Sequence, residues 1–180
     1  MKSPVNQQDL QKQDIAPGLA ALVSPADGGI WLDLATYQRW LQRRVENEDE
    51  ALPDTGSEPL AETSPQALFC PQCGALLQKY RLSSEHSARL DRCTPCHSVW
   101  IDAAEWAALV RTGSTHSLLQ VLSDAGQRSI REAETRQRQH ARYRERFGAD
   151  DFARLQATRD WLNAHPQRAE LLAYLQKPAD

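Results

Sequence analysis

The chain has 180 residues, of which 41% are hydrophobic and 25% are charged, and its formal net charge is −3. This composition is typical of a globular protein and argues against a wholly disordered chain. No apolar run approaches the roughly 18 residues of a spanning helix, and the first residues lack the apolar stretch of a secretory signal. We therefore expect a cytoplasmic protein without a membrane segment. The net charge also argues against a globally basic nucleic-acid binder.

Residues 1–45 share a sequence frame with a later part of the chain. Residues 24–33 end in Gly-Gly-Ile-Trp-Leu-Asp, and residues 93–102 end in His-Ser-Val-Trp-Ile-Asp, so that Trp31 takes the place of Trp100. We interpret the match as an internal repeat, the alternative being a strand and a helix that converged on a common pattern. A module of about 45 residues buries little surface by itself. We therefore expect it to dock on the rest of the chain or on a partner.

Residues 46–66 are predicted to form a linker. They contain seven acidic and no basic residues, together with three prolines and one glycine. A segment of this composition cannot bury enough apolar surface to become ordered. A solvated spacer is the favoured interpretation, and a specific acidic binding motif is the alternative.

The four cysteines of the chain form two C-x2-C pairs, Cys70 with Cys73 and Cys93 with Cys96. The 19 residues between the pairs fit the spacing of a zinc signature and the length of a β-hairpin that brings the pairs together. We therefore predict that all four thiolates bind one structural Zn2+ within residues 67–113. Four protein ligands leave no open coordination position, which disfavours a catalytic zinc.

Disulfide formation, binding of another metal and thiol-redox chemistry are the alternatives for these cysteines. Disulfides are rare in the reducing compartment that we expect, and a C-x-x-C redox site normally lies in a βαβ unit, for which the sequence gives no sign. After the second pair, Asp102 is an N-cap residue and Glu105 completes a capping box, so a short helix is predicted there.

This region resembles the bacterial transcription factor IIB-type zinc ribbon family. The resemblance lies in the order of its motifs, which is Cys-Pro-Gln-Cys-Gly, a hairpin, Cys-Thr-Pro-Cys, Val-Trp-Ile-Asp and a short helix. The resemblance covers about residues 68–111, a quarter of the chain. It implies a zinc ribbon fold, the four cysteines as zinc ligands, and Trp100 as the conspicuous aromatic residue after the second pair. We further expect the metal-bound hairpin to present Trp100 to a partner. The family usually has Gly-Gly after the last cysteine, where this chain has His97 and Ser98.

The repeat extends this interpretation to the N-terminal segment. Its residues at the four ligand positions would be Ser3, Asn6, Ser24 and Asp27. Hydroxyl and amide groups are poor zinc ligands beside thiolates, and one carboxylate is not enough. Residues 1–45 are therefore predicted to be a degenerate ribbon that holds no metal.

Residues 114–180 are predicted to form a helical tail. Its central part is rich in arginine, and Gly126 is expected to break or kink the helix before it. Four arginines lie near one face at helical periodicity, namely Arg128, Arg131, Arg138 and Arg142. Arg146 is a fifth candidate for contact with nucleic acid or a partner. Three interpretations remain open, namely a solvated connecting helix, a phosphate-binding face and a site for an acidic protein.

The last residues are predicted to form a helical hairpin. Gly148 ends the arginine-rich helix, Asp150 is expected to cap the next one, and Pro166 suits the first turn of the last. Core packing is the expected role of Trp161 and Tyr174.

The sequence as a whole predicts a small α+β protein with one four-cysteine zinc ribbon, a metal-free copy of it and a helical tail. No catalytic constellation is recognisable, so we expect a non-enzymatic protein without a small-molecule substrate. The leading hypothesis is a zinc-binding adaptor for an unidentified protein, linked to transcription if the resemblance holds. The alternatives are DNA or RNA binding through the arginine-rich helix and a thiol-redox protein.

Overall fold

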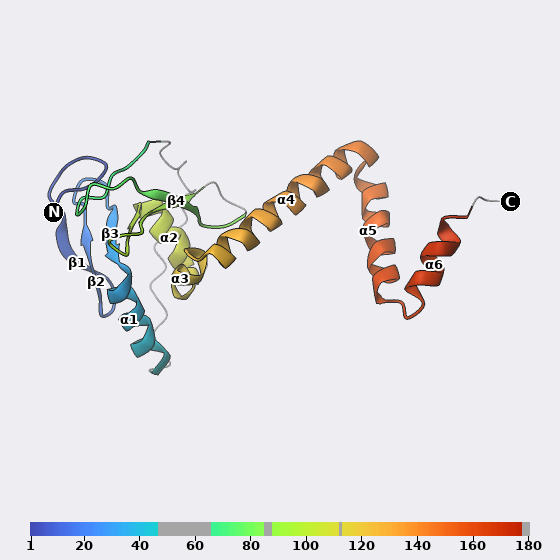
Figure 1. The fold of residues 1–180 in the computed structure, drawn as a ribbon, viewed down its shortest axis with the longest axis horizontal. Coiled ribbons are helices and arrows are strands. Elements are labelled where there is room, and N and C mark those ends of the chain that lie inside the picture. The colour runs from blue at the N-terminus through green and yellow to red at the C-terminus, as the bar shows by residue number, and fades with distance from the viewer. Residues whose placement is uncertain (47–65, 85–87, 112, 178–180) are drawn as a thin grey trace. The chain divides into compact units, whose positions relative to one another are not determined.

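The computed structural model describes residues 1–46, 66–84, 88–111 and 113–177 (Figure 1). The predicted linker lies outside them except at its ends. The strands are β1 (Gln11–Ala16), β2 (Leu19–Val23), β3 (Ile30–Asp33), β4 (Gln78–Arg81), β5 (Arg89–Cys93) and β6 (Ser98–Ile101). The helices are α1 (Leu34–Glu46), α2 (Ala103–Arg111), α3 (Leu118–Val121), α4 (Asp124–Phe147), α5 (Ala149–Ala164) and α6 (Arg168–Leu175), and a 3-10 turn spans Ser114–His116.

These elements make a small α+β protein, as predicted. The chain divides into a first unit, Met1–Glu132, and a second unit, Ala133–Asp180, and each is described by itself. Among the described residues, no helix combines the length and the apolar character that a membrane crossing needs.

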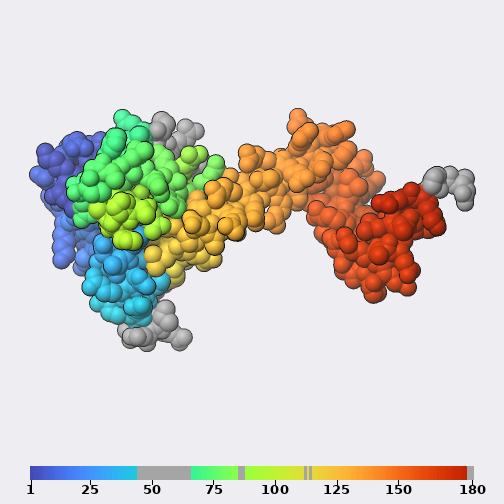
Figure 2. All heavy atoms as spheres, viewed as in Figure 1, coloured from blue at the N-terminus to red at the C-terminus, as the bar shows by residue number. Residues whose placement is uncertain are grey.

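One antiparallel sheet with the order β1-β2-β3-β6-β5-β4 unites the N-terminal half (residues 1–46) and the cysteine half (residues 66–111). Each half supplies three consecutive strands, and β3 pairs with β6 at the centre of the sheet. In that pairing Trp31 lies opposite Trp100, and these are the equivalent positions of the sequence repeat. A pseudo-two-fold axis therefore passes between the two tryptophans, and the two halves lie against each other (blue and green in Figure 2).

The main hydrophobic core lies between one face of this sheet and helices α1, α2 and α3. Alternate residues of the central strands point into it, among them Ile30 and Leu32 of β3. Tyr37 and Trp40 of α1 are buried in the same core. The Tyr37 hydroxyl donates to the carbonyl of Thr115, and the Trp40 indole donates to that of Pro17 at 2.9 Å. Both aromatic rings are thus buried with their polar atoms hydrogen-bonded, as burial requires.

The opposite face of the sheet is covered by the loops that carry the cysteines. Trp31 and Trp100 lie at its centre, each 3% exposed. A smaller cluster forms around them with Leu10, Leu68, Cys70, Leu77 and Cys93. Both faces of β3 are therefore covered. The apolar surface that the N-terminal half could not bury by itself is buried by contact with the cysteine half.

Both halves continue from their last strand into a capped helix. The carboxylate of Asp33 accepts the backbone N–H of Thr36 at 2.6 Å, and that of Asp102 accepts the N–H of Glu105 at 2.7 Å. Glu105 returns a bond from its own carboxylate to the N–H of Asp102 at 3.0 Å. This reciprocal pair is the capping box predicted from the sequence.

The predicted break at Gly126 is wrong. Gly126 lies in the first turn of α4, and the interruption comes just before it, after α3. Ser123 caps α4, since its hydroxyl accepts the N–H of Gly126 at 3.0 Å. A Cβ at residue 126 would overlap the carbonyl of Gln120, so the glycine permits the close approach of two helices.

The second unit contains the end of α4 together with α5 and α6. Among its described residues only Leu162 is buried. The core roles predicted for Trp161 and Tyr174 are therefore wrong, because these side chains are 54% and 73% exposed. Gly148 occupies the N-cap of α5, and the expected cap residue, Asp150, lies in the first helical turn.

Candidate metal centre

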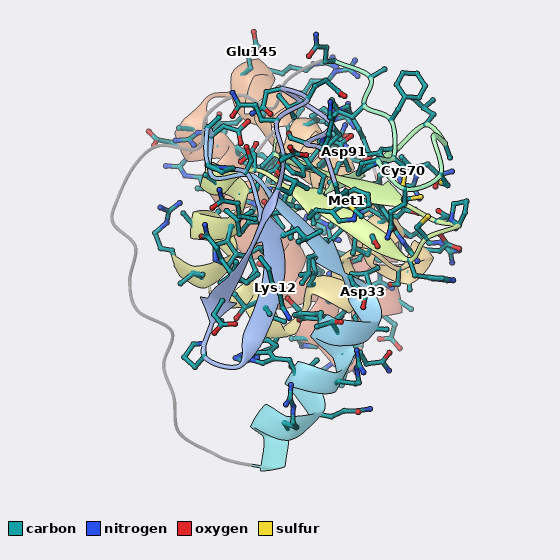
Figure 3. The ribbon with its side chains drawn as sticks, turned by 90° about the vertical axis from the view of Figure 1, so that its left-hand side faces the viewer. Met1, Lys12, Asp33, Cys70, Asp91 and Glu145 are labelled. Carbon is teal, nitrogen blue, oxygen red and sulfur yellow. The ribbon has the colours of Figure 1, made fainter. Side chains whose placement is uncertain are left out.

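The two cysteine pairs come together beside β5 and β6. Cys70 and Cys73 lie in a turn closed by the bridge between Phe69 and Leu76, Cys93 ends β5, and Cys96 lies in the turn before β6. All four sulfur atoms lie within 4.8 Å of one another, and they gather beside the Cys70 label in Figure 3.

The sulfur separations fit a tetrahedral ion. The Cys70 and Cys96 sulfurs are 3.8 Å apart, and those of Cys73 and Cys93 are 3.6 Å apart. A tetrahedron of sulfurs around a metal at about 2.3 Å has edges of about 3.8 Å. These separations are much longer than the roughly 2.05 Å of a disulfide bond, and all four cysteines are free. The cysteine tetrad can therefore hold a metal ion.

The backbone around the first pair is shaped for the convergence of its sulfurs. The carbonyl of Cys70 accepts the N–H of Gly74 at 2.9 Å, and the N–H of Cys70 donates to Ala75 at 2.8 Å. Gly74 has φ +72°, which glycine adopts without steric cost. The N–H of Gln72 points at the Cys70 sulfur at 3.4 Å and can stabilise a thiolate there.

The second pair reaches a similar geometry without a glycine. His97 has φ +51° at the position equivalent to Gly28, whose φ is +68°. Residues with a Cβ adopt this left-handed region only at a cost. The departure from Gly-Gly noted in the sequence thus leaves the turn in place, with some strain carried by His97.

The thiols of the tetrad differ in pKa. A hydrogen bond from the backbone of Ala75, supported by the neighbouring thiols, lowers the pKa of Cys73 to about 7. A hydrogen bond with Cys73, followed by burial, raises the pKa of Cys96 to about 12, and burial raises the pKa of Cys93. A metal ion must displace these protons, so its affinity is expected to fall as the pH falls.

The four equivalent positions of the N-terminal half also come together, but through hydrogen bonds. The Asn6 amide donates to the hydroxyl of Ser24 at 3.2 Å and to the carboxylate of Asp27 at 2.9 Å. The Ser3 hydroxyl accepts the N–H of Val5 at 3.2 Å. An amide group thus bridges the two turns at the place where the cysteine half brings its sulfurs together.

Two acidic residues of the cysteine half are buried, which the sequence did not predict. Asp91 is 4% exposed and pairs with Lys79 at 3.1 Å, on the same face of the sheet as Trp100. Glu105 is 3% exposed, and its carboxylate accepts the N–H of Arg89 at 3.0 Å in addition to that of Asp102. The capping pattern predicted the bond between Glu105 and Asp102, but burial of the carboxylate depends on β5, which is distant in sequence.

Glu105 is expected to make the protein less stable as the pH rises. Burial, and then the charge of Asp102, raise the pKa of Glu105 from 4.5 to about 8. The native state therefore holds a proton that the unfolded chain releases between these values, and stability falls with rising pH across this window by at most about 1.4 kcal/mol per pH unit. Glu105→Gln should reduce this slope, which urea denaturation between pH 5.5 and 8.5 would measure.

The difference between the two proteins at each pH isolates this effect, because metal binding and the other acids contribute to both. Glutamine is a neutral isostere of the protonated acid, so the variant should gain in stability relative to the unmodified protein as the pH rises from 5.5 to 8.5. Parallel curves for the two proteins would contradict the assignment.

The other residues singled out in the sequence are placed as follows. Trp100 is buried, so the expected contact of this side chain with a partner is wrong, because its partner is the N-terminal half of the same chain. The five selected arginines all lie on α4 and are exposed: Arg128, Arg131, Arg138, Arg142 and Arg146.

Comparison with family models, with curated proteins and with solved structures finds no match for this chain. The cysteine tetrad and the exposed surfaces of the described residues are therefore the features that point to a function.

Proposed function

We propose that the cysteine half is a zinc ribbon in which Cys70, Cys73, Cys93 and Cys96 hold one structural Zn2+. The observation that carries the proposal is the tetrahedral fit of the sulfur separations. An all-thiolate site favours zinc over harder cations such as Mg2+ or Ca2+. With four protein ligands the ion has no open position for a substrate, so its role is to stabilise the fold.

The N-terminal half, in this proposal, is a copy of the ribbon that has exchanged its ion for hydrogen bonds. Three observations support it: the shared turn conformations at Gln7 and Gly74, the matching short bridges, and the matching helix caps. The pair then acts as one scaffold, with a single ion on one side of the pseudo-two-fold axis.

The function that fits this scaffold best is a non-enzymatic interaction module with a protein partner. Its support comes from the second unit, where large apolar side chains such as Trp161, Tyr174 and Leu175 are exposed. Helices with so little buried surface gain stability when a partner covers them. A link to transcription rests only on the resemblance of residues 68–111 to the zinc ribbon family.

Metal analysis of the purified full chain tests the first proposal. We expect one equivalent of zinc per chain, and replacement by Co2+ should give the absorption spectrum of a tetrahedral tetrathiolate complex. Two equivalents would mean that the N-terminal half also binds metal. Absence of metal after purification under reducing conditions, together with no uptake of Co2+, would contradict the proposal.

Nucleic-acid binding through α4 is the second candidate function. The observation that favours it is that all five selected arginines are exposed on one helix that has no buried residue among those described. Contacts with phosphates make affinity depend steeply on salt. Loss of binding to DNA or RNA with rising salt, reduced when these arginines are replaced, would support this candidate.

A further inference from the structure

We propose that the part of α4 in the second unit, residues 133–147, binds single-stranded nucleic acid, with arginines on the phosphates and exposed aromatic rings on the bases. The inference rests on the second candidate function and specifies its ligand. It depends on two groups of side chains that the helix places next to each other.

The first group is a row of three arginines. Arg138, Arg142 and Arg146 follow one another at intervals of four residues, so one side of the helix presents a guanidinium about every 6 Å along its axis. All three are exposed, and none forms an ion pair with another described residue. Residues 133–147 hold five arginines and two glutamates, so this segment attracts anions although the whole chain is acidic.

Arginines elsewhere in the same unit are engaged differently. On α5, Arg154 pairs with Asp151 at 3.6 Å and Arg159 pairs with Asp160 at 3.3 Å. Their charges are balanced by neighbouring carboxylates. They therefore provide matched controls for the row on α4.

The second group is a pair of stacked aromatic rings beside the row. Tyr143 and Phe147 are 39% and 43% exposed, and their ring centroids lie 5.8 Å apart with an angle of 14° between the planes. The guanidinium of Arg146 lies over the Phe147 ring, 5.8 Å from its centroid. An arginine and an exposed ring are thus already placed together, in the combination that binds a phosphate and an adjacent base.

The rings favour a single strand over a duplex. Bases of a duplex are stacked on one another and cannot lie on a side-chain ring, whereas unpaired bases can stack on aromatic side chains whatever their identity. Stacking on an aromatic ring accepts any base, so we expect little sequence preference. An acidic protein would also be attracted to the arginines, but would gain nothing specific from the stacked rings.

Fluorescence anisotropy of the full-length, zinc-loaded protein with labelled oligothymidylate, oligouridylate, a DNA duplex and a polyglutamate peptide tests the proposal. We expect the single strands to bind most tightly. The double variant Arg138→Ala/Arg142→Ala should weaken their binding and lower the slope of log affinity against log salt by about 1.4, since each contact with a single strand contributes about 0.7. The matched variant Arg154→Ala/Arg159→Ala should bind like the unmodified protein.

The aromatic contribution is tested separately. Tyr143→Ala/Phe147→Ala should lose roughly tenfold in affinity for single strands, with an unchanged salt slope and unchanged duplex binding. Tyr174→Ala removes an exposed ring from α6 and serves as the control. Circular dichroism and zinc content of each variant establish that the helices and the metal centre remain intact.

The outcomes separate this inference from the function on which it rests. Equal affinity for duplex and single strands, with no effect of the aromatic variant, would overturn the single-strand inference and leave nucleic-acid binding in place. No nucleic-acid binding at low salt, or equal effects of the two arginine variants, would overturn both. Arginine-dependent binding of polyglutamate alone would also overturn both and assign the surface to an acidic protein.

Discussion

Replacement of Cys93 by serine is expected to abolish metal binding and to unfold the cysteine half. Cys93 is 1% exposed, ends β5, and has its sulfur 3.6 Å from that of Cys73. Binding of a structural zinc contributes an apparent 10–16 kcal/mol, on the order of the whole stability of a small domain. Because β5 pairs with β6 and β6 with β3, the loss should spread to the N-terminal half.

Zinc content and thermal unfolding followed by circular dichroism would measure this effect. The matched control is Ser24→Ala, at the equivalent position of the N-terminal half, where the side chain is 1% exposed and accepts a hydrogen bond from Asn6. This variant should keep its zinc and lose only about 1 kcal/mol. Retention of one tightly bound equivalent by Cys93→Ser would show that the tetrad is not the metal site.

Replacement of Gly29 by alanine is expected to destabilise the protein by about 3 kcal/mol. A Cβ at residue 29 would overlap the ring of Trp100, which is 3% exposed and packed at the centre of the sheet. A rigid buried ring cannot move aside without disturbing both clusters around it, and overpacking of this kind costs about 1–3 kcal/mol or more. Urea denaturation would measure the loss as a shift of the midpoint.

The double variant Gly29→Ala/Trp100→Leu identifies the cause. If the ring is what obstructs the methyl group, the two substitutions together should cost clearly less than the sum of their separate effects. Gly148→Ala is the control for backbone strain alone, because Gly148 has φ +82° and no atom near the added methyl group. Additive effects, or a loss of less than about 0.5 kcal/mol for Gly29→Ala, would contradict this account of the packing.

The sequence by itself predicted the features that depend on short spacings. Two C-x2-C pairs at a hairpin's distance predicted that the four cysteines would cluster, and the structure brings their sulfurs together. The capping box between Asp102 and Glu105 was predicted for the same reason, since its partners are three residues apart. The identity of the ion, the partner and the division of the chain into modules stay predictions.

The tertiary structure decided what depends on contacts between distant segments. The pairing of β3 with β6 buries Trp100, although the repeat that supplies its partner Trp31 was visible in the sequence. Trp161 and Tyr174 were predicted to be buried in a core and are exposed instead. An aromatic residue on a helix indicates a surface that needs covering, but composition does not say whether the same chain covers it. Burial is set by which surfaces meet in space, and local sequence patterns do not encode that choice when the partner is far away along the chain.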